Sequence, residues 1–355
     1  MSSTSDMPRE KTITPERISE LAELHFAEPV VRITAPGGKK RDSVRVHFRD
    51  RSVIASYRYR PSRLQREILV LEKLHGAGAP VPEYLGRQGA LLFQSDVGSG
   101  RLSSQMHGRD HAGQVALARA AFDSLWTIKR AAKETGLTEQ VPEVGVTSVF
   151  VARFATCAQR IGRGLDLALP AVDWGGISRA VVPVPRHFVK WDARSGNAAL
   201  RGDGTLSWFD WEHAGRRMGV EDFGFLIADE FWPLSPEDSL EAFAATCPGR
   251  AEALLPHLIR FSALQAIERI RLIQNEVFKR GWTDFRRAQR YDRMGAAPEL
   301  LRSVARHGDA LARLDPLTAP LSGWCSQAAE ALIAWQPERP ERPEKADQAP
   351  ASNAP

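Results

Sequence analysis

The chain has 355 residues, of which 43% are hydrophobic and 26% charged, and its formal net charge is +5. This composition is typical of a folded globular protein and excludes a fibre or a wholly disordered chain. No stretch reaches the roughly 18 uninterrupted apolar residues of a membrane span, and the first residues lack the apolar core of a secretion signal, so we expect a cytoplasmic protein. The three cysteines (Cys157, Cys247 and Cys325) lie far apart and are expected to be buried thiols.

The positive charge is concentrated in one stretch. Between Lys39 and Arg66 there are ten lysines and arginines but only two aspartates. Such a stretch is typical of a nucleic-acid surface or of a pocket for the phosphates of a nucleotide. A surface for single-stranded nucleic acid would need interleaved aromatic residues, and only Phe48, Tyr57 and Tyr59 occur here. The motifs further along the chain lead us to favour the phosphate pocket, with a nucleic-acid surface as the less favoured alternative, and we expect no membrane partner.

The first part of the chain predicts a small lobe built around one sheet. Pro15 directly after Thr14 is typical of a helix start and predicts a helix over 15–26. Short β-rich runs separated by turn residues predict an antiparallel meander, followed by one amphipathic helix and two further strands. The strands are expected over 30–35, 43–48, 52–59, 81–86 and 89–95, and the helix over 62–78. We expect an N-lobe over 14–97, after a disordered segment over 1–13.

The rest of the chain predicts a larger helical lobe over 98–335. Helical spacing of apolar residues predicts helices over 110–134, 147–162, 174–182, 235–246, 250–279 and 296–313. Residues 187–211 interrupt this pattern with a compact non-helical island. The last twenty residues contain five prolines and no large aliphatic side chain, so we expect residues 336–355 to be disordered. The expected fold class is α+β, with a β-rich lobe and a helical lobe around a cleft.

The non-helical island contains three side chains suited to phosphate chemistry. Two short runs, 198–201 and 206–210, flank a Gly-Asp-Gly turn and predict a hairpin. This hairpin would bring Asn197 beside Asp210, with Asp192 on the loop leading in. An amide oxygen and a carboxylate are suited to Mg²⁺ that carries a polyphosphate, and a second carboxylate can accept the proton of an attacking hydroxyl. The pattern predicts a metal site next to a general base.

These residues resemble the catalytic loop and metal-binding strand of the aminoglycoside phosphotransferase and choline kinase group, which are relatives of protein kinases. The matching segments are Asp192-Ala-Arg-Ser-Gly-Asn197, Phe209-Asp210-Trp211-Glu212 and Gly219-Val-Glu-Asp222. The resemblance implies that Asp192 is the catalytic base and that Asn197 and Asp210 are Mg²⁺ ligands. It further implies that Asp222 is a buried brace of the catalytic loop. The likeness is strong over about 187–226 and weak over about 28–335.

The resemblance implies a bilobal protein-kinase-like fold and an activity. The expected reaction is phosphoryl transfer from ATP, or GTP, to the hydroxyl group of a small-molecule acceptor, with Mg²⁺ as the metal cofactor. In the N-lobe, the amides of a Gly37-Gly38 turn, together with Ser43, are expected to cover the phosphates. Residues 93–97 are expected to face the adenine. The candidate nucleotide-binding residues are Gly37, Gly38, Ser43, Arg58, Glu67, Gln94 and Asp96.

Two departures from the family pattern leave an alternative open. The family keeps a nucleotide-binding lysine on the third strand, with a glutamate partner on the next helix. The strand here has no lysine, which leaves Arg58 or Arg60 for that role, with Glu67 as the helix partner. Lys190 stands where the family has histidine, two residues before the base. The alternative is therefore a catalytically degenerate, pseudokinase-like protein that binds a nucleotide or a partner without transfer.

The acceptor is expected to bind in the helical lobe, and its chemistry stays open. The resemblance implies that acidic side chains there would hold the amines of a cationic acceptor, and this lobe offers Asp229, Glu230, Glu268, Glu276 and Asp284. Arginines are interspersed among them, so the sequence does not predict a pocket for a polycation. A neutral or anionic hydroxyl compound therefore remains open beside an aminoglycoside.

Overall fold

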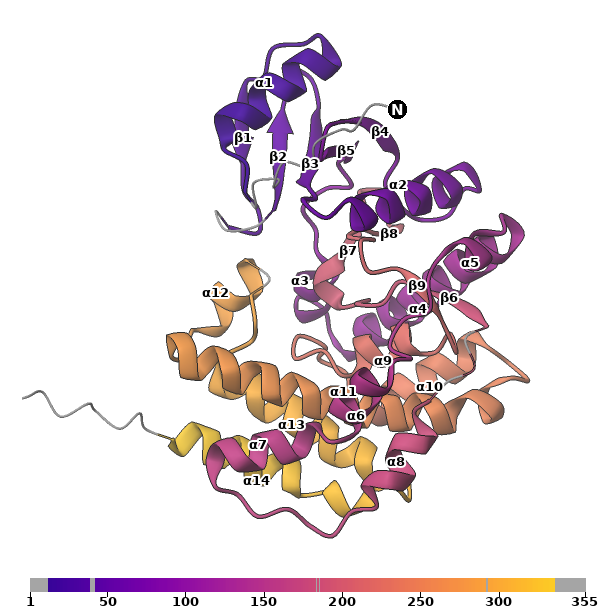
Figure 1. Ribbon diagram of the computed structural model, residues 1–355, viewed down its shortest axis with the longest axis vertical. Coiled ribbons are helices and arrows are strands. Elements are labelled where there is room, and N and C mark those ends of the chain that lie inside the picture. The colour runs from indigo at the N-terminus through magenta and orange to yellow at the C-terminus, as the bar shows by residue number, and fades with distance from the viewer. Residues whose placement is uncertain (1–11, 39–41, 183, 185, 292, 336–355) are drawn as a thin grey trace, which may run out of the picture.

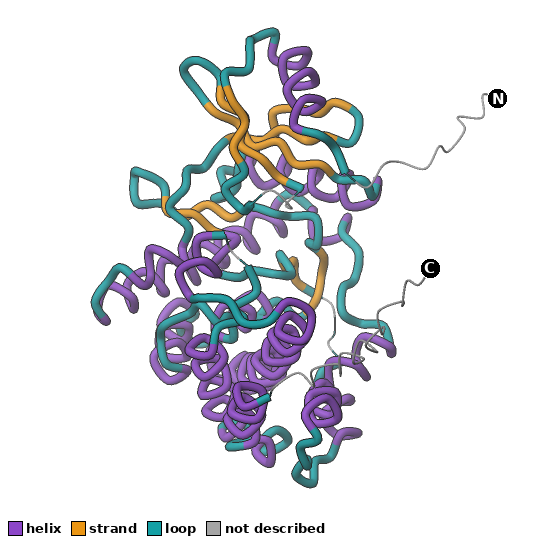
Figure 2. The backbone as a smooth tube through the Cα atoms, turned by 90° about the vertical axis from the view of Figure 1, so that its left-hand side faces the viewer, coloured by secondary structure: helices purple, strands orange, loops and turns teal. Residues whose placement is uncertain are grey.

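The computed structural model describes residues 12–38, 42–182, 184, 186–291 and 293–335. A small lobe with most of the strands stands on a larger helical lobe, as Figures 1 and 2 show in two perpendicular views. The expected α+β architecture with two lobes is confirmed. The termini expected to be disordered, 1–11 and 336–355, lie outside the described residues.

The small lobe is a five-stranded antiparallel sheet with a helix on each face. The sheet order is β1-β2-β3-β5-β4. The strands are β1 (Arg32–Thr34), β2 (Ser43–His47), β3 (Ser52–Tyr57), β4 (Tyr84–Gln88) and β5 (Leu91–Ser95). Since side chains alternate along a strand, Phe93 packs with the residues of α1 (Pro15–Phe26), whereas Leu92 packs with those of α2 (Pro61–Gly76). The predicted meander and both helices are present.

Local sequence explains where the helices of this lobe begin. Thr14 precedes α1 with an extended backbone, and its hydroxyl accepts a hydrogen bond from the amide of Arg17. Pro15 then occupies the first helical turn, where its missing N–H costs nothing. Pro61 stands in the same position in α2.

The large lobe is built around α11 (Ala251–Arg280), which packs against α7, α9 and α13. Its other helices are α3 (Leu102–His107), α4 (His111–Glu134), α5 (Leu137–Gln140), α6 (Ser148–Ala155), α7 (Cys157–Leu165), α8 (Trp174–Ala180), α9 (Glu221–Ile227), α10 (Pro236–Thr246), α12 (Phe285–Arg290), α13 (Pro298–Arg313) and α14 (Trp324–Ala334). Short 3₁₀ turns cover Ser195–Asn197 and Ala319–Leu321. The expected helix over 147–162 is two helices, because the chain leaves helical geometry at Thr156.

Two small two-stranded antiparallel sheets form the island between the helices. The predicted one pairs β7 (Ala198–Leu200) with β8 (Leu206–Trp208). A second, which the sequence did not indicate, pairs β6 (His187–Val189) with β9 (Gly215–Arg217). Together they hold the catalytic-loop segment between the two lobes.

Two simpler expectations can also be compared with the structure. The three cysteines are buried and unpaired, as expected. Within the described part of the chain, no helix combines the length and the apolar character that crossing a membrane would require.

Candidate active site

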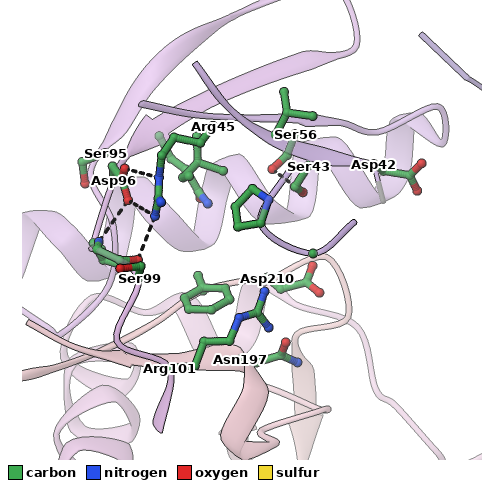
Figure 3. A pocket seen from close by; sticks show the side chains of 18 of the residues that line it. Asp42, Ser43, Arg45, Ser56, Ser95, Asp96, Ser99, Arg101, Asn197 and Asp210 are labelled. Atoms are coloured by element: carbon green, nitrogen blue, oxygen red, sulfur yellow. Dashed lines mark hydrogen bonds and ion pairs between the residues drawn. The ribbon is translucent and has the colours of Figure 1, made fainter. Parts of the chain in front are cut away.

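A cavity of about 690 Å³ lies between the two lobes. The small lobe contributes its β1–β2 turn, strands β2 and β3, and the segment that follows β5, while the large lobe contributes Asn197 and Asp210. Figure 3 shows Ser43 and Ser56 on one side of this cavity and Asn197 and Asp210 on the opposite side. The predicted metal ligands therefore face the predicted nucleotide-binding turn.

The catalytic-loop segment carries unusual backbone conformations. Trp191, Asp192 and Asp210 have φ of 55°, 102° and 65°, although none is a glycine. Positive φ costs side-chain-bearing residues free energy and persists only where surrounding contacts enforce it. Such conformations cluster at functional sites, which supports a special role for this loop.

Asp222 supplies the enforcing contacts. Its carboxylate accepts hydrogen bonds from the amide of Lys190 at 3.0 Å and from the amide of Trp191 at 2.9 Å. It also forms an ion pair with Lys129, whose ammonium donates a further hydrogen bond to the carbonyl of Phe188. Asp222 is buried, so these bonds are shielded from water. The contacts are those expected of a brace of the catalytic loop.

Asn197 links the predicted base to the predicted metal site. Its Nδ2 donates to the backbone carbonyl of Asp192 at 2.9 Å and to Asp192 Oδ2 at 3.0 Å. These bonds use the amide nitrogen and leave the side-chain oxygen Oδ1 for another ligand. The amide of Phe209 donates to the Asn197 carbonyl, which holds the start of the Asp210 loop beside it. The predicted hairpin thus brings Asn197 and Asp210 to one cavity.

Asp192 is ionised at neutral pH. Burial alone would raise the pKa of its carboxyl group, but Arg194, Lys190 and Arg269 outweigh burial and hold that pKa below its ordinary value. Arg194 Nε donates to Asp192 Oδ1 at 3.0 Å. Asp192 does not line the interlobe cavity; it lines a second cavity on the side of α6 and α11. A carboxylate held there can orient a hydroxyl group through a hydrogen bond.

Arg58, rather than Arg60, lies beside Asp210, a predicted metal ligand. Its Nε donates to Glu67 Oε2 at 2.6 Å, and its Nη2 donates to Asp210 Oδ1 at 2.9 Å. Burial opposes its charge, but Glu67 and Asp210 outweigh burial and raise the pKa of Arg58. Arg60 instead precedes α2, and its guanidinium lies 5.4 Å from the ring centre of Tyr59. The pairing expected between a strand cation and Glu67 is present with arginine.

The side chain of Lys190 bonds to both the loop that carries Asp192 and the loop that carries Asp210. Its side chain is fully buried, and burial lowers its pKa despite the neighbouring carboxylates of Asp210 and Asp192. Its Nζ donates to the backbone carbonyl of Asp210 at 2.8 Å and to that of Asp192 at 3.4 Å. The ammonium also lies 5.2 Å from the ring centre of Trp211. The lysine therefore bridges loops instead of pointing into the interlobe cavity.

The turn between β1 and β2 forms as expected, with one correction. Gly38 has φ of 90° and donates its amide to the carbonyl of Ala35, so this amide closes the turn and is not free for phosphate. Gly37 and Ser43 line the interlobe cavity. The hydroxyl of Ser43 lies 2.8 Å from that of Ser56 on the neighbouring strand. Lys39, Lys40 and Arg41, the basic tip of this turn, lie outside the described residues.

The end of β5 and the segment after it also line the cavity, in part as expected. Gln94 faces it, and its buried Oε1 has no hydrogen-bond partner among the described residues. Asp96 lines it too, but its carboxylate already pairs with Arg45 and accepts from Ser52. Phe93 points to the opposite face of the sheet, so the expectation that it faces the adenine is wrong.

The sequence reasoning missed a contribution from α12. This short helix brings Arg286, Gln289 and Arg290 to the interlobe cavity from the large lobe. In Figure 1 it rises toward the β1–β2 turn. The basic composition of the segment was visible, but six mostly polar residues carry no helical apolar pattern that would have indicated where they lie.

The acidic residues considered for an acceptor mostly serve other roles. Asp229 and Glu230 are buried, Asp229 accepting two hydrogen bonds from Ser195 and Glu230 pairing with Arg269. Burial, with the neighbouring Glu230, raises the pKa of Asp229 to about 6. Glu276 pairs with Arg280 and Asp284 caps α12, which leaves Glu268 as the one of these five that lines the second cavity.

Five arginines of the basic stretch of the small lobe make contacts within the protein. Arg45 pairs with Asp96, Arg58 with Glu67, and Arg63 with Glu212. Two further arginines of the stretch, at 51 and 66, bond to Glu28 and to the Glu212 carbonyl.

Comparisons with known proteins support the fold. No protein-family profile and no curated protein sequence matches the chain. Among solved structures, the GDP complex of wild-type aminoglycoside 2'-phosphotransferase-IIIa is 12% identical with a TM-score of 0.55, over 82% of this chain and 99% of that one. The GDP and kanamycin complex of APH(2")-IIia is 15% identical with a TM-score of 0.54, over 74% and 92%.

A third solved structure is similar over a comparable length. It is a choline/ethanolamine kinase family protein from Mesorhizobium loti, which is 16% identical with a TM-score of 0.51, over 85% of this chain and 92% of that one. At these identities the likeness shows the fold alone. The chain has the bilobal, protein-kinase-like fold of the aminoglycoside phosphotransferases and choline kinases, which confirms the fold implied by the sequence motifs.

Proposed function

We propose that this protein transfers the γ-phosphoryl group of a nucleoside triphosphate, ATP or GTP, to the hydroxyl group of a small molecule. One observation carries the proposal. Asn197 and Asp210 line the interlobe cavity, whereas Asp192, which accepts a hydrogen bond from Asn197, lines the second cavity. The two cavities are thus lined by neighbouring residues of the three kinds that phosphoryl transfer needs. A donor in one and an acceptor in the other would face each other there.

The known binding partners of similar structures support the same arrangement. The two aminoglycoside phosphotransferase structures contain GDP, and one also contains kanamycin. An interlobe cavity of about 690 Å³ lies in the range of small-molecule sites. Arg58, Arg286 and Arg290 line it, and their guanidinium groups suit phosphate oxygens.

Mg²⁺ fits the donor set of this cavity when phosphate completes it. Among the described residues, no three histidine, cysteine, aspartate or glutamate side chains gather to hold a metal ion. Mg²⁺ characteristically takes one or two protein oxygens together with waters and substrate phosphates. Asn197 Oδ1 and the carboxylate of Asp210 are two such oxygens. Bound there, Mg²⁺ would neutralise negative charge on the transferring phosphate.

In this mechanism the protein mainly positions the reactants. Asp192 accepts the hydrogen bond of the acceptor hydroxyl and then its proton, which aims the oxygen at the γ-phosphorus. The Asp222 carboxylate accepts hydrogen bonds from the backbone amides just before Asp192, and Lys190 donates to the Asp210 carbonyl. These bonds hold the Asp192 carboxylate at a fixed place relative to Asp210. Arg58 and the α12 arginines hold the phosphates from the other side. Catalysis then rests on positioning and charge neutralisation.

The test is turnover by the full chain with a panel of hydroxyl compounds. ATP or GTP, Mg²⁺ and an aminoglycoside, choline, a sugar or a hydroxy acid are incubated with the protein, and the phosphate ester is measured by mass spectrometry. We expect Asp192→Asn to lower transfer by about 10² to 10⁴-fold while nucleotide binding persists. Asp123→Asn, the same change at an exposed position of α4, is the matched control.

Two results would contradict the proposal. Equal transfer by the Asp192→Asn and Asp123→Asn variants would remove Asp192 from the reaction. Nucleotide binding by the unmodified protein without transfer to any of the compounds would favour the pseudokinase-like alternative.

A further inference from the structure

The second cavity, which has a volume of about 500 Å³, has a chemistry that bears on the acceptor. It opens beside Asp192 and is bounded by α6, α9 and α11. This inference rests on the proposed function, because it asks which hydroxyl compound fits the place where that carboxylate can reach it.

Aromatic rings form one wall of the second cavity. Phe150 and Trp191 have ring centres 5.6 Å apart, and Trp191 meets Phe225 edge to face at 5.3 Å. Phe150 also stacks on Phe154 at 5.6 Å with an angle of 17° between their planes. Phe150 and Trp191 are half-buried and line the cavity, so part of each ring remains available for contact. Rigid aromatic surfaces of this kind favour a flat ring as the occupant.

Two arginines and two acids line the cavity, but each acid is also paired with an arginine outside the lining. Glu268 accepts two hydrogen bonds from Arg271 and one from Arg160, so its negative charge is already shared by two guanidinium groups. Asp192 is paired with Arg194. Arg153 also lines the cavity, is exposed, and makes no ion pair with any other described residue. The surplus charge of the cavity is therefore positive.

Arg160 adds to this surplus. Its Nη2 donates to the backbone carbonyl of Arg153, so the Arg160 guanidinium lies beside the part of α6 that carries Arg153. Its buried Nε has no hydrogen-bond partner in the described part of the chain. Burial lowers the pKa of Arg160, and the positive charges of Arg271 and Arg153 act in the same direction although Glu268 opposes them. An anion would relieve this repulsion, whereas an ammonium group would increase it.

Gln265 offers a neutral contact in the same cavity. It lies on α11, is buried, and lines the cavity, and its side-chain amide makes no hydrogen bond to another described residue. Its amide can donate to an acceptor oxygen or accept from a hydroxyl group. The cavity therefore contains a ring-binding wall, an anion-binding corner and a neutral polar group near the base.

We infer that the acceptor is a hydroxy acid with a flat ring: a molecule whose ring contacts Phe150 and Trp191, whose anionic group pairs with Arg153 and Arg160, and whose hydroxyl faces Asp192. In the reaction the hydroxyl oxygen forms a bond to the γ-phosphorus as the bond between that phosphorus and the bridging oxygen of the nucleotide breaks. The hydroxyl proton passes to the Asp192 carboxylate. The products are a phosphate monoester and a nucleoside diphosphate.

The experiment compares four probes that differ in one feature each. They are 4-(hydroxymethyl)benzoate, uncharged benzyl alcohol, cationic 4-(hydroxymethyl)benzylamine, and 6-hydroxyhexanoate, which keeps acid and hydroxyl but lacks the ring. Binding to the full chain is measured by ligand-observed NMR without nucleotide, and ester formation by ³¹P NMR with Mg²⁺ and ATP or GTP. Because a charged hydrogen bond changes affinity by about tenfold to a hundredfold, we expect the benzoate to bind at least about tenfold more tightly than the amine.

A charge reversal tests whether the arginine causes the preference. Arg153→Glu should weaken benzoate binding by at least about tenfold and strengthen binding of the amine. Arg163→Glu, the same reversal at an exposed position of α7 that does not line the cavity, should leave the preference unchanged.

The outcomes separate the inference from the proposed function. Equal binding of the benzoate and the amine, preference for the amine, or no binding of any probe overturns the inference. An unchanged preference in Arg153→Glu, or tighter binding of the ring-free acid, also overturns it. Failure of Mg²⁺-dependent nucleotide binding would instead overturn the proposed function, because the probe-binding measurement needs no nucleotide.

Discussion

Replacing Glu67 by alanine is expected to destabilise the protein by about 3 kcal/mol. The Glu67 side chain is fully buried and accepts hydrogen bonds from Arg58 at 2.6 and 3.2 Å and from the amide of Trp211 at 3.3 Å. Removing one partner of a buried ion pair leaves an uncompensated buried charge, which costs about 3 to 5 kcal/mol. We expect the lower end, because Asp210 and Glu212 remain 2.9 and 3.7 Å from the Arg58 guanidinium.

The free energy of unfolding is measured by urea titration with tryptophan fluorescence. Glu72→Ala changes an exposed glutamate of the same helix and should shift stability by no more than about 0.5 kcal/mol. The double variant Arg58→Ala/Glu67→Ala should lose less free energy of unfolding than the two single variants lose in total, by more than about 1 kcal/mol. A Glu67→Ala variant within about 1 kcal/mol of Glu72→Ala would refute the reasoning.

Three further predictions concern the supports of the site. Burial would raise the pKa of Glu221, but contacts with His257 and Arg217 lower that pKa from 4.5 to about 2. The contribution of Glu221 to the stability of the folded protein is therefore present above pH 4.5 and is lost as the pH falls toward 2. In urea titrations at pH 6 and 3, Glu221→Gln should therefore remove about 2 kcal/mol of the acid-induced loss of stability, and an unchanged loss would contradict this. Gly145 has φ of 64°, and a Cβ there would overlap the Arg217 guanidinium. Gly145→Ala should therefore lower the free energy of unfolding by more than about 1 kcal/mol, whereas a neutral effect would argue against the close packing. Lys190→Met removes the bridge between the two active-site loops, so kcat should fall by more than about tenfold with little change in the KM of the acceptor, and a loss confined to KM would count against a positioning role.

Elements with a strong pattern were predictable from the sequence. The helix His111–Glu134 repeats its apolar residues at helical spacing, and the hairpin of β7 and β8 has a Gly-Asp-Gly turn. All seven residues of α9 are buried, so no contrast between polar and apolar faces indicated a helix there. The pairing of β6 with β9 joins segments of three residues each, which are too short to carry a readable alternation. The alanine-rich α14 was overlooked although its composition favours a helix.

The candidate site divides in the same way. Asn197 and Asp210 lie close in sequence, and the hairpin between them was enough to predict that they lie side by side. The spacing did not indicate that Asp192 lines the second cavity. Arg58 and Arg60 were not distinguishable, because the choice depends on where the strand ends and on the three carboxylates that meet the side chain.

The acceptor cavity depends on contacts between distant parts of the chain. Arg153 on α6 and Glu268 on α11 line the same cavity only in the folded protein, and the pairing of Glu268 with Arg271 decides the surplus charge. Burial likewise makes Asp229 and Glu230 inaccessible to an acceptor, although both follow the Asp222 segment in the sequence. Such outcomes follow from tertiary packing and carry no local signal.

Calorimetric titration of the protein with ATP and with GTP, each with and without Mg²⁺, tests the central claim most directly when repeated on Asp210→Ala. The account predicts saturable binding of at least one nucleotide that needs Mg²⁺ and is strongly weakened in the variant, because Asp210 supplies a metal ligand at the interlobe cavity. The control Asp203→Ala, in the exposed turn between β7 and β8, should bind as the unmodified protein does. Absence of binding with either nucleotide, or equal Mg²⁺-dependent binding by the Asp210→Ala variant, would contradict the account.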